Sequence, residues 1–302
     1  MRVFVTGATG NIGSAVVEQL VAAGHSVLGL CRAPEKAAAL QAAGGEVLHG
    51  LLEDGALLRE AAASCDGVIH LGFKHDFSRF VANCEDDRAV IRALAEGLAD
   101  SGRPLLVTSG VPLANTVPGE PAREHYPIVG TEVHPRAATE QAAALAAAAG
   151  VNVSVVRLPQ VHDTRSQGLI TPMIARFREL GYCAYVGDGT QRWPAAHRLD
   201  VARLYRLAFE RAEPDAKYHA VNEGGVALRD MAEVIGRRLD LPVRSVDAEQ
   251  ATEVFGWLAR FAGHDVPASS ELTRRWLGWE PEGPGLLSDL ANLELAGGTQ
   301  YP

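Results

Sequence analysis

The amino-acid sequence predicts an α/β fold built on a doubly wound parallel sheet, from two periodic features and one glycine turn. Short, β-branched apolar runs recur along the first half of the chain, at residues 3–6, 27–30, 47–48, 68–71, 105–107 and 153–156. Helical patterns lie between these runs, at about 35–43, 55–64, 79–100 and 136–149. Continuously apolar strands that alternate with helices are typical of a parallel sheet covered by helices on both faces.

The first strand runs directly into three glycines spaced three apart, and a helical pattern follows over 14–24. A helix N-terminus presents free backbone N–H groups and a positive dipole end, which together bind a pyrophosphate. Glycine is required because a Cβ atom would block the turn, the approach of the phosphates or the packing of helix on strand. A surface turn without function is the alternative, and the flanking strand and helix argue against it. We therefore expect a Rossmann-type dinucleotide site that uses Gly7, Thr9, Gly10, Asn11, Ile12 and Gly13.

The end of the second strand indicates which dinucleotide is bound. An acidic residue there contacts the ribose 2′-hydroxyl of NAD, whereas an arginine accommodates the 2′-phosphate of NADP. The strand ends at Arg32 with no Asp or Glu in reach, and Lys36 follows one helical turn later. A solvated arginine on a surface loop is the alternative. We predict NADP(H) as the cofactor, with Arg32 and Lys36 near its 2′-phosphate.

Other cofactor-binding residues are expected just beyond the carboxyl ends of the strands, which line the ligand site of open α/β sheets. Leu52 follows the third strand and should border the adenine, and Gly72 follows the fourth strand, where the chain passes beneath the pyrophosphate. The remaining candidates at strand ends are Leu71, Phe73, Lys74, Thr108 and Gln160.

The pattern changes after about residue 160. The segment 166–190 is rich in glycine, proline and polar residues around one helix at 170–180. Strand-like pieces at 218–221 and 243–246 alternate with helical patterns near 201–212, 228–239 and 247–261. We predict an NADP-binding domain over 1–160, to which parts of about 190–222 return. A smaller, interleaved substrate-binding cap is predicted over 161–302.

Composition narrows the possible partners and the compartment. No stretch of the 302 residues approaches the roughly 18–20 apolar residues of a membrane span. The first strand begins at the N-terminus without an export signal, and the four cysteines are scattered, which favours reduced thiols in a cytoplasmic protein. A net charge of −9 disfavours nucleic acid and anionic membranes as partners. We therefore expect a small-molecule substrate.

Two further expectations concern metal binding and assembly. No histidine or carboxylate spacing typical of a metal site occurs, so no metal is expected. The alanine-rich helix 137–149 fits either close packing on the sheet or a tight contact between subunits. A homodimer that uses the helices at 79–100 and 136–149 is therefore one prediction.

Four motifs extend these inferences along nearly the whole chain. They are Thr6-Gly7-x-x-Gly10-x-x-Gly13, Arg157-Leu158-Pro159-Gln160-Val161-His162, Gly187-Asp188-Gly189 with His197-Arg198-Leu199-Asp200, and Leu277-Gly278-Trp279-Glu280-Pro281. Together they resemble the extended short-chain dehydrogenase/reductase family, whose members include sugar-nucleotide epimerases and dehydratases. The resemblance implies a Rossmann fold with a nicotinamide cofactor, and it places Pro159 and Gln160 at the nicotinamide end.

The chain departs from this family where the family carries its Tyr-x-x-x-Lys pair. In this family a glutamate usually lies four residues after the lysine, and Glu140 matches that glutamate. The lysine position is then Arg136, and the tyrosine position, four residues earlier, is Glu132. Pro135 lies between them and should open the helix, so the two side chains would not share a helical face. The sequence thus resembles the atypical branch of the family, which keeps the cofactor fold without the standard pair.

Five residues remain as candidates for the chemistry. Arg136 could stabilise negative charge, although a guanidinium does not give up its proton. Ser109 carries a hydroxyl group and follows the fifth predicted strand. Tyr126 lies in the loop that precedes the fifth predicted helix. His75 and His162 both follow strand ends and titrate near neutrality. For Tyr126 and the two histidines, a purely structural role is the alternative.

The predicted function is that of an NADP(H)-dependent oxidoreductase, which reduces a small carbonyl compound or oxidises the matching alcohol. Two alternatives stay open. Because the tyrosine–lysine pair is missing, the protein could bind NADP(H) as a redox sensor or regulator without turnover. It could also be an epimerase, isomerase or lyase, with a sugar nucleotide as one possible substrate.

Overall fold

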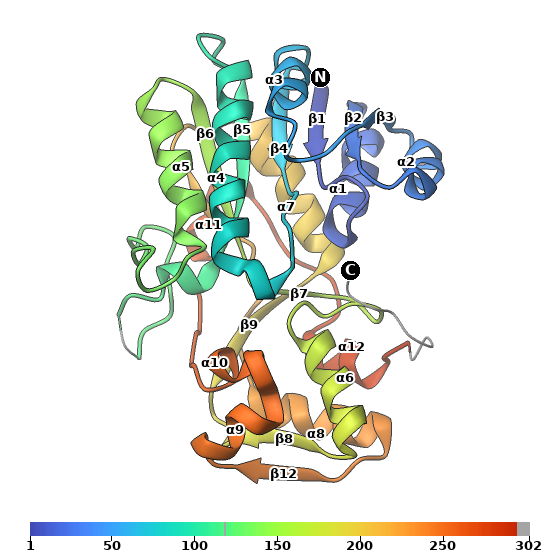
Figure 1. The fold of residues 1–302 in the computed structure, drawn as a ribbon, viewed down its shortest axis with the longest axis vertical. Helices are drawn as coiled ribbons and strands as arrows, with labels where there is room; N and C mark the ends of the chain where they lie inside the picture. Colours follow the sequence, from blue (N-terminus) through green and yellow to red (C-terminus); the bar gives the residue numbers. More distant parts are fainter. Residues whose placement is uncertain (118, 295–302) are drawn as a thin grey trace.

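The computed structural model describes residues 1–117 and 119–294, and residue 118 and the end of the predicted cap, 295–302, lie outside the described residues. Its main sheet has seven strands, namely β1 (Arg2–Thr6), β2 (Ser26–Cys31), β3 (Glu46–His49), β4 (Gly67–His70), β5 (Pro104–Gly110), β6 (Asn152–Leu158) and β10 (Lys217–His219). Their order is β10-β6-β5-β4-β1-β2-β3, and every pairing is parallel (Figure 1). The predicted α/β fold class is confirmed.

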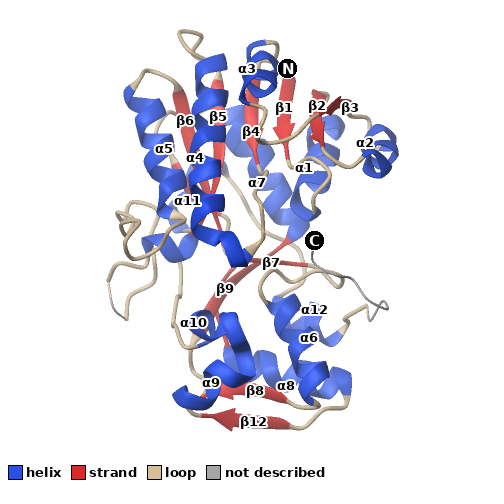
Figure 2. Cartoon of the chain, viewed as in Figure 1, coloured by secondary structure: helices blue, strands red, loops and turns tan. Residues whose placement is uncertain are grey.

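Helices cover both faces of this sheet, as Figure 2 shows. One face carries α1 (Asn11–Ala22), α2 (Ala37–Ala42) and α7 (Arg198–Arg211), and their apolar side chains share a buried cluster with the strands. The opposite face carries α3 (Gly55–Ala63), α4 (Phe80–Gly97) and α5 (Ala137–Ala148), with a second cluster. Two covered faces explain why the strands are continuously apolar in sequence.

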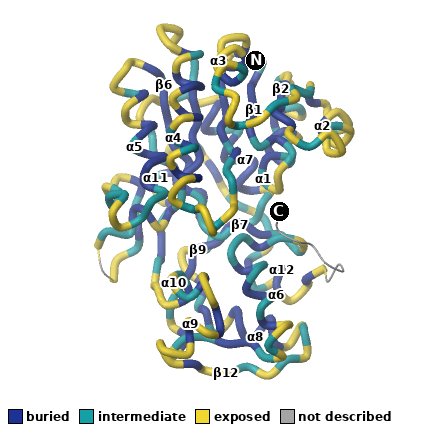
Figure 3. The backbone as a smooth tube through the Cα atoms, in the orientation of Figure 1, coloured by how far each residue is buried: buried dark blue, intermediate teal, exposed yellow. Residues whose placement is uncertain are grey.

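A third buried cluster belongs to the second half of the chain. It is formed mainly by α6 (Ile170–Leu180), β8 (Cys183–Val186), α8 (Leu228–Leu239), β12 (Val243–Val246), α9 (Ala248–Phe255), α10 (Ala259–Ala262) and α12 (Leu286–Ala291). Strands β8 and β12 pair in parallel. Asp247 starts α9 with a capping box, in which its carboxylate accepts from the backbone N–H of Gln250. In Figure 3 the buried residues of this part lie apart from those of the main sheet.

A three-stranded sheet connects the two parts. It consists of β7 (Gln160–His162), β9 (Arg192–His197) and β11 (Glu223–Ala227), in the order β11-β9-β7. Successive side chains of a strand point to opposite faces. Accordingly, Ala196 of β9 joins the cluster of the main sheet, whereas Trp193 and Ala195 join that of the second part. This sheet fixes how the two parts face one another.

The chain returns to the main sheet after β9, through α7 and β10, and α11 (Glu271–Leu277) packs beside them. The limits of the two predicted domains stay a prediction. Helix α5 begins at Ala137, two residues later than the predicted start at Pro135, whose carbonyl accepts from the N–H of Ala138. Glu132 therefore lies outside the helix, as predicted. No helix of the described chain has the length and apolarity needed to cross a bilayer.

Candidate active site

The glycine turn between β1 and α1 is closely packed against the end of β4. Gly7 has φ +69°, and a Cβ atom there would lie 2.8 Å from the backbone nitrogen of Gly72. A Cβ on Gly13 would lie 2.0 Å from the carbonyl oxygen of Gly7. Gly10 caps α1 without a side-chain acceptor, and no acidic residue occupies the first turn. The helix N-terminus therefore stays available to an anion, which fits the pyrophosphate of a dinucleotide.

The other residues of the turn lie at its surface. Asn11 is exposed, and Thr9 and Ile12 are half-buried. At the end of β2, Arg32 and Lys36 are also exposed. Among the described residues, neither Arg32 nor Lys36 has a side-chain hydrogen bond or ion pair. Both cations are thus free to contact a phosphate group.

A cavity of about 580 Å³ opens where the ends of β3 and β4 meet α3 and α4. Four of the residues predicted to bind the cofactor line it, namely Leu52, Gly72, Phe73 and Lys74. The ammonium of Lys74 lies 2.6 Å from Glu53 and 2.7 Å from Asp86, and hydrogen bonds to these carboxylates raise its pKa. Lys74 therefore stays charged, with its charge already balanced by two acidic groups.

Arg136 is held at the ends of β4 and β5. Its Nη1 lies 2.7 Å from Oδ2 of Asp87 and 2.7 Å from Oγ1 of Thr139, and its Nη2 donates to the carbonyl of Thr108 at 3.1 Å. The guanidinium also stacks on Phe73, 3.8 Å from the ring centroid. Its Nε–H and one Nη2–H have no acceptor among the described residues. Arg136 therefore combines a fixed position with free donors.

A buried chain of hydrogen bonds holds Asp87, the ion-pair partner of Arg136, in place. Oδ1 of Asp87 lies 3.0 Å from Nε2 of His70, and Nδ1 of His70 lies 2.7 Å from the hydroxyl of Thr6. Burial opposes the charge of Asp87, but Arg136, His70 and Thr139 outweigh it and lower the pKa of this carboxyl to about 2. Asp87 is thus ionised at neutral pH and fixes the guanidinium through a charged hydrogen bond.

Ser109 and Thr108 face the interior. The hydroxyl of Ser109 donates to Glu140 at 2.7 Å, and Glu140 also accepts two hydrogen bonds from Arg157, at 2.9 Å each. Ser109 is only 4% exposed, so its hydroxyl is not available to polarise a substrate carbonyl. Thr108 hydrogen-bonds the carbonyl of His70 and the hydroxyl of Tyr205. We do not retain Ser109 as a polarising residue.

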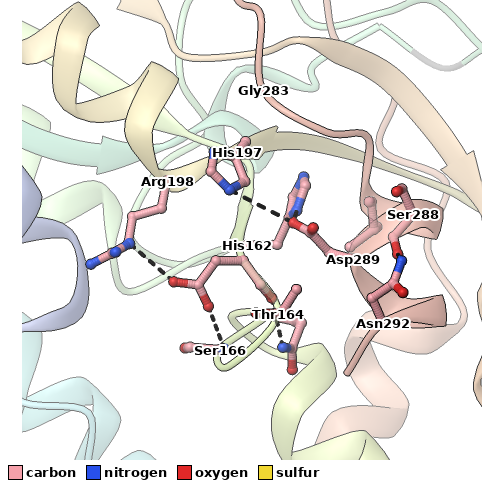
Figure 4. A network of polar contacts seen from close by, with 12 residues as sticks. His162, Thr164, Ser166, His197, Arg198, Gly283, Ser288, Asp289 and Asn292 are labelled. Carbon is pink, nitrogen blue, oxygen red and sulfur yellow. Dashed lines mark hydrogen bonds and ion pairs between the residues drawn. The ribbon is translucent and has the colours of Figure 1, made fainter. Parts of the chain in front are cut away.

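Tyr126 and His162 are also engaged elsewhere. The hydroxyl of Tyr126 donates to the exposed Glu120 at 2.8 Å rather than to a group around Arg136. His162 is fully buried, and its Nδ1 lies 2.7 Å from Oδ2 of Asp289 in α12. Figure 4 shows the rings of His162 and His197 close to the carboxylate of Asp289, and both face the same oxygen, Oδ2. These geometries favour structural roles for both predicted residues.

His75 does lie near Arg136. Its ring is 5.4 Å from that of Phe73, on which Arg136 stacks. Although His75 is exposed, desolvation by the surrounding protein and then the charge of Arg136 lower its pKa below 6.5. Of the five catalytic candidates, the structure therefore brings together Arg136 and His75. Glu132 does not join Arg136 and His75, because its carboxylate packs against the backbone of Gly130.

Pro159 directly precedes β7, Gln160 begins β7, and Arg198 begins α7. Pro159 is half-buried, and the amide oxygen of Gln160 accepts from the backbone N–H of Leu169 at 3.0 Å. Arg198, which the sequence analysis did not select, donates from Nη1 to the carbonyl of Asn11 at 3.2 Å and lies 3.0 Å from Asp163 (Figure 4). It therefore links the turn to the second part. Its position in the His197-Arg198-Leu199-Asp200 motif gave no signal for this contact.

Asp87 was also missed, although the sequence holds a signal for it. Asn83, Asp87, Val90 and Leu94 recur at helical spacing and share the buried face of α4. A carboxylate on an otherwise apolar helix face requires a buried partner. Here that partner is Arg136, 49 positions later in the sequence.

Comparisons with known proteins identify the family. A family model described as "NAD dependent epimerase/dehydratase family" matches residues 3–224. The chain belongs to this family. An uncharacterized protein of Schizosaccharomyces pombe is 43% identical to this chain over 293 residues, which cover 97% of the chain and 99% of that protein. The resemblance inferred from the sequence motifs is thus confirmed.

More distant relatives extend the comparison. A 4-hydroxy-2-methyl-3-oxo-4-farnesyl-3,4-dihydroquinoline-1-oxide ketoreductase of Stigmatella aurantiaca is 27% identical, over 87% of this chain and 79% of that protein. A double mutant of the dTDP-glucose 4,6-dehydratase from Streptomyces venezuelae, solved with NAD, has a TM-score of 0.77 at 20% identity, over 97% of this chain and 95% of that one. The second likeness shows the shared fold. The family and its reductase relative indicate an oxidoreductase-type enzyme that depends on a nicotinamide dinucleotide.

Proposed function

We propose that the protein is an NADP(H)-dependent oxidoreductase that reduces a small carbonyl compound, or oxidises the matching alcohol, with Arg136 as the group that binds the carbonyl oxygen. One observation carries this proposal. Arg136, which counting along the motif assigns to the lysine position of the family, is fixed by Asp87, while its Nε–H and one Nη2–H remain free among the described residues. A fixed cationic donor of this kind stabilises a developing alkoxide.

The dinucleotide would be held by the glycine turn, with Arg32 and Lys36 at the 2′-phosphate and with Leu52, Gly72 and Phe73 at the cavity. The free cations at the end of β2 support NADP(H) over NAD(H). When bound, the reduced dinucleotide supplies a hydride to the carbonyl carbon, and its own nicotinamide is oxidised. The carbonyl oxygen takes up a proton, so that the product is an alcohol.

Arg136 cannot supply this proton, because a guanidinium retains its own. Its contribution is to bind the carbonyl oxygen and to stabilise the negative charge that forms there. The proton then comes from His75 or from water. His75 is placed for this step by its contact with Phe73, and its lowered pKa makes the protonated ring a stronger acid.

The test is to incubate the purified protein with NADPH or NADH and a panel of ketones, aldehydes and enones. Consumption of the reduced nicotinamide is followed by absorbance, and the alcohol is identified by mass spectrometry. We expect alcohol formation in proportion to NADPH consumed, with NADPH preferred. Tight NADPH binding without any turnover contradicts this function and supports a redox sensor, for which the missing tyrosine–lysine pair is the argument. Substrate conversion without net cofactor oxidation supports an epimerase, isomerase or lyase.

A further inference from the structure

We propose that the substrate carries an aromatic ring, which binds against a cluster of aromatic side chains that spans both parts of the molecule. This inference rests on the proposed function for the reaction itself and adds no chemical step to it. The cluster, here called the aromatic wall, consists of Phe73, Phe77, Phe80, Trp257 and Phe261. None of these residues has a role in the cofactor site except Phe73, which also lines the cavity at the end of β4.

The wall is continuous across the boundary between the two parts. Phe77 lies in the 3-10 helix Phe77–Arg79 just before α4, and Trp257 lies in the 3-10 helix Gly256–Leu258 between α9 and α10. Their rings are stacked, with centroids 4.2 Å apart and planes inclined by 19°. Phe80 lies 5.7 Å from Phe77, and Phe261 lies 6.0 Å from Trp257. Figure 1 shows the start of α4 directed toward α10 in the second part.

The phenylalanines of the wall differ from the other phenylalanines of the chain in their exposure to solvent. The chain has eight phenylalanines, and four of them are buried in the hydrophobic clusters, namely Phe4, Phe177, Phe209 and Phe255. The four that are not buried all belong to the wall, and Trp257 is 43% exposed. Contiguous apolar surface of this kind marks a binding site, whereas single exposed apolar residues are ordinary.

The wall also reaches the group that binds the carbonyl oxygen. Arg136 stacks on Phe73 at 3.8 Å, and Phe73 lies 6.3 Å from Phe80 in an edge-on arrangement. When the carbonyl oxygen of a substrate binds the free N–H groups of Arg136, a substituent on its carbonyl carbon is therefore within reach of the rings of Phe73 and Phe80. Rings prefer offset or edge-on contacts with other rings at such separations.

Two histidines border the wall. The ring of His75 lies 6.4 Å from Phe77, and that of His134 lies 5.9 Å from Phe80. The wall thus offers apolar ring surface with a few polar groups at its edge, which is the usual make-up of a site for a small organic ligand. An aryl ketone or aryl aldehyde matches this combination, since its carbonyl suits Arg136 and its ring suits the wall.

The test compares two ketones that differ in one respect, acetophenone and cyclohexyl methyl ketone. Ligand-observed NMR titrations with the full chain, in the presence of NADP⁺ and separately of NAD⁺, measure binding without turnover. We expect acetophenone to bind wild type more tightly, and Trp257→Leu to weaken acetophenone about tenfold. The same substitution should change the affinity for the cyclohexyl ketone by less than about twofold, because it removes mainly ring–ring contact. Trp257→Phe should retain the affinity for acetophenone.

The matched control is Trp276→Leu. Trp276 is 41% exposed and contacts Tyr218 edge-on, outside the wall. An equal loss in Trp276→Leu, equal losses for both ketones, or no binding of acetophenone would overturn the proposal. If acetophenone binds through Trp257 but no ketone is ever reduced, the proposed function fails and the aromatic site stands. If only aliphatic carbonyls are bound and reduced, the proposed function stands and the aromatic site fails.

Discussion

The Nη1 atom of Arg136 lies 2.7 Å from Oδ2 of Asp87, in an ion pair whose two members differ in exposure. The Asp87 side chain is 2% exposed, and that of Arg136 is 14% exposed. The carboxylate is therefore a buried anchor, and the guanidinium is the end that a ligand can reach. His70 and Thr139 complete the hydrogen bonds of the anchor. This arrangement provides a fixed positive charge at the start of α5.

Replacing Arg136 by methionine should lower kcat for carbonyl reduction by about 10²- to 10³-fold, because the donor to the developing alkoxide is lost. The substitution also leaves the buried charge of Asp87 without its cation, which should cost about 3 kcal/mol of stability. Steady-state kinetics and urea unfolding measure the two effects.

The double variant Asp87→Asn with Arg136→Met separates the two effects. It removes both charges, so it should recover much of the stability of the single variant while its kcat stays low. Arg211→Met is the surface control, because Arg211, the last residue of α7, pairs with Glu213 in an exposed ion pair. Full activity in the double variant contradicts the role of Arg136.

Replacing Arg32 by alanine should weaken NADPH binding about 10- to 100-fold and change NADH binding by less than about threefold. The reason is that a charge-assisted contact to the 2′-phosphate is lost, and NADH has no such phosphate. Calorimetric titration with both coenzymes checks this. An unchanged ratio of NADPH to NADH affinity shows that Arg32 does not contact the 2′-phosphate.

Arg198 should affect both coenzymes alike. Its guanidinium donates to the carbonyl of Asn11 and pairs with Asp163, so Arg198→Met loosens the glycine turn without touching a group that differs between NADPH and NADH. We expect both affinities to fall by a similar factor of about 3 to 10. A change in the affinity ratio, as expected for Arg32→Ala, would be inconsistent with this positioning role.

The main sheet was predictable from sequence because its strands are short apolar runs and each helix between them has its own periodicity. The connecting sheet was not. Strand β7 has only three residues, β9 contains Pro194, and β11 contains two glycines. They pair only because distant segments meet between the two cores. Ala195 of β9 lies opposite Gln160 of β7, 35 positions earlier, and opposite Glu223 of β11, 28 positions later. Local pattern holds no signal for such a meeting.

The candidate site was also predictable only in part. The glycine turn and Arg32 follow from local rules about strand ends, and the position of Arg136 follows from counting along a motif. Ser109 satisfied the same strand-end rule, yet it faces Glu140 because the buried Arg157–Glu140 pair takes its hydroxyl. The stacking of Phe77 on Trp257 joins residues 180 positions apart. Only the folded chain shows that contact.

Acid should destabilise the protein through His219. Its Nδ1 lies 2.9 Å from the carbonyl of Ser269, and its Nε2 lies 3.3 Å from Arg157, so the ring is neutral with the proton on Nδ1. Burial and the charge of Arg157 lower its pKa to about 3, against about 6.5 in the unfolded chain. Between these values only the unfolded chain takes up the proton. The free energy of unfolding should therefore fall by up to about 1.4 kcal/mol per pH unit below about 6.5.

The variant His219→Gln checks this by urea unfolding between about pH 7 and 5. It should lose stability less steeply with acid than wild type, since glutamine does not titrate. Identical slopes would show that His219 is not the group that takes up the proton.

The pH dependence of catalysis should identify the proton donor. If protonated His75 supplies the proton, kcat/KM for carbonyl reduction falls as pH rises through its pKa, which lies below 6.5 because desolvation and Arg136 disfavour the charged ring. Alcohol oxidation needs the neutral ring, so its rate should rise through the same pKa and then level off. His75→Gln should remove this limb from both profiles and lower reduction in acid by about tenfold or more. Retention of the limb in His75→Gln, with loss of activity confined to Arg136 variants, would assign the proton to water, because Arg136 itself does not titrate in this range.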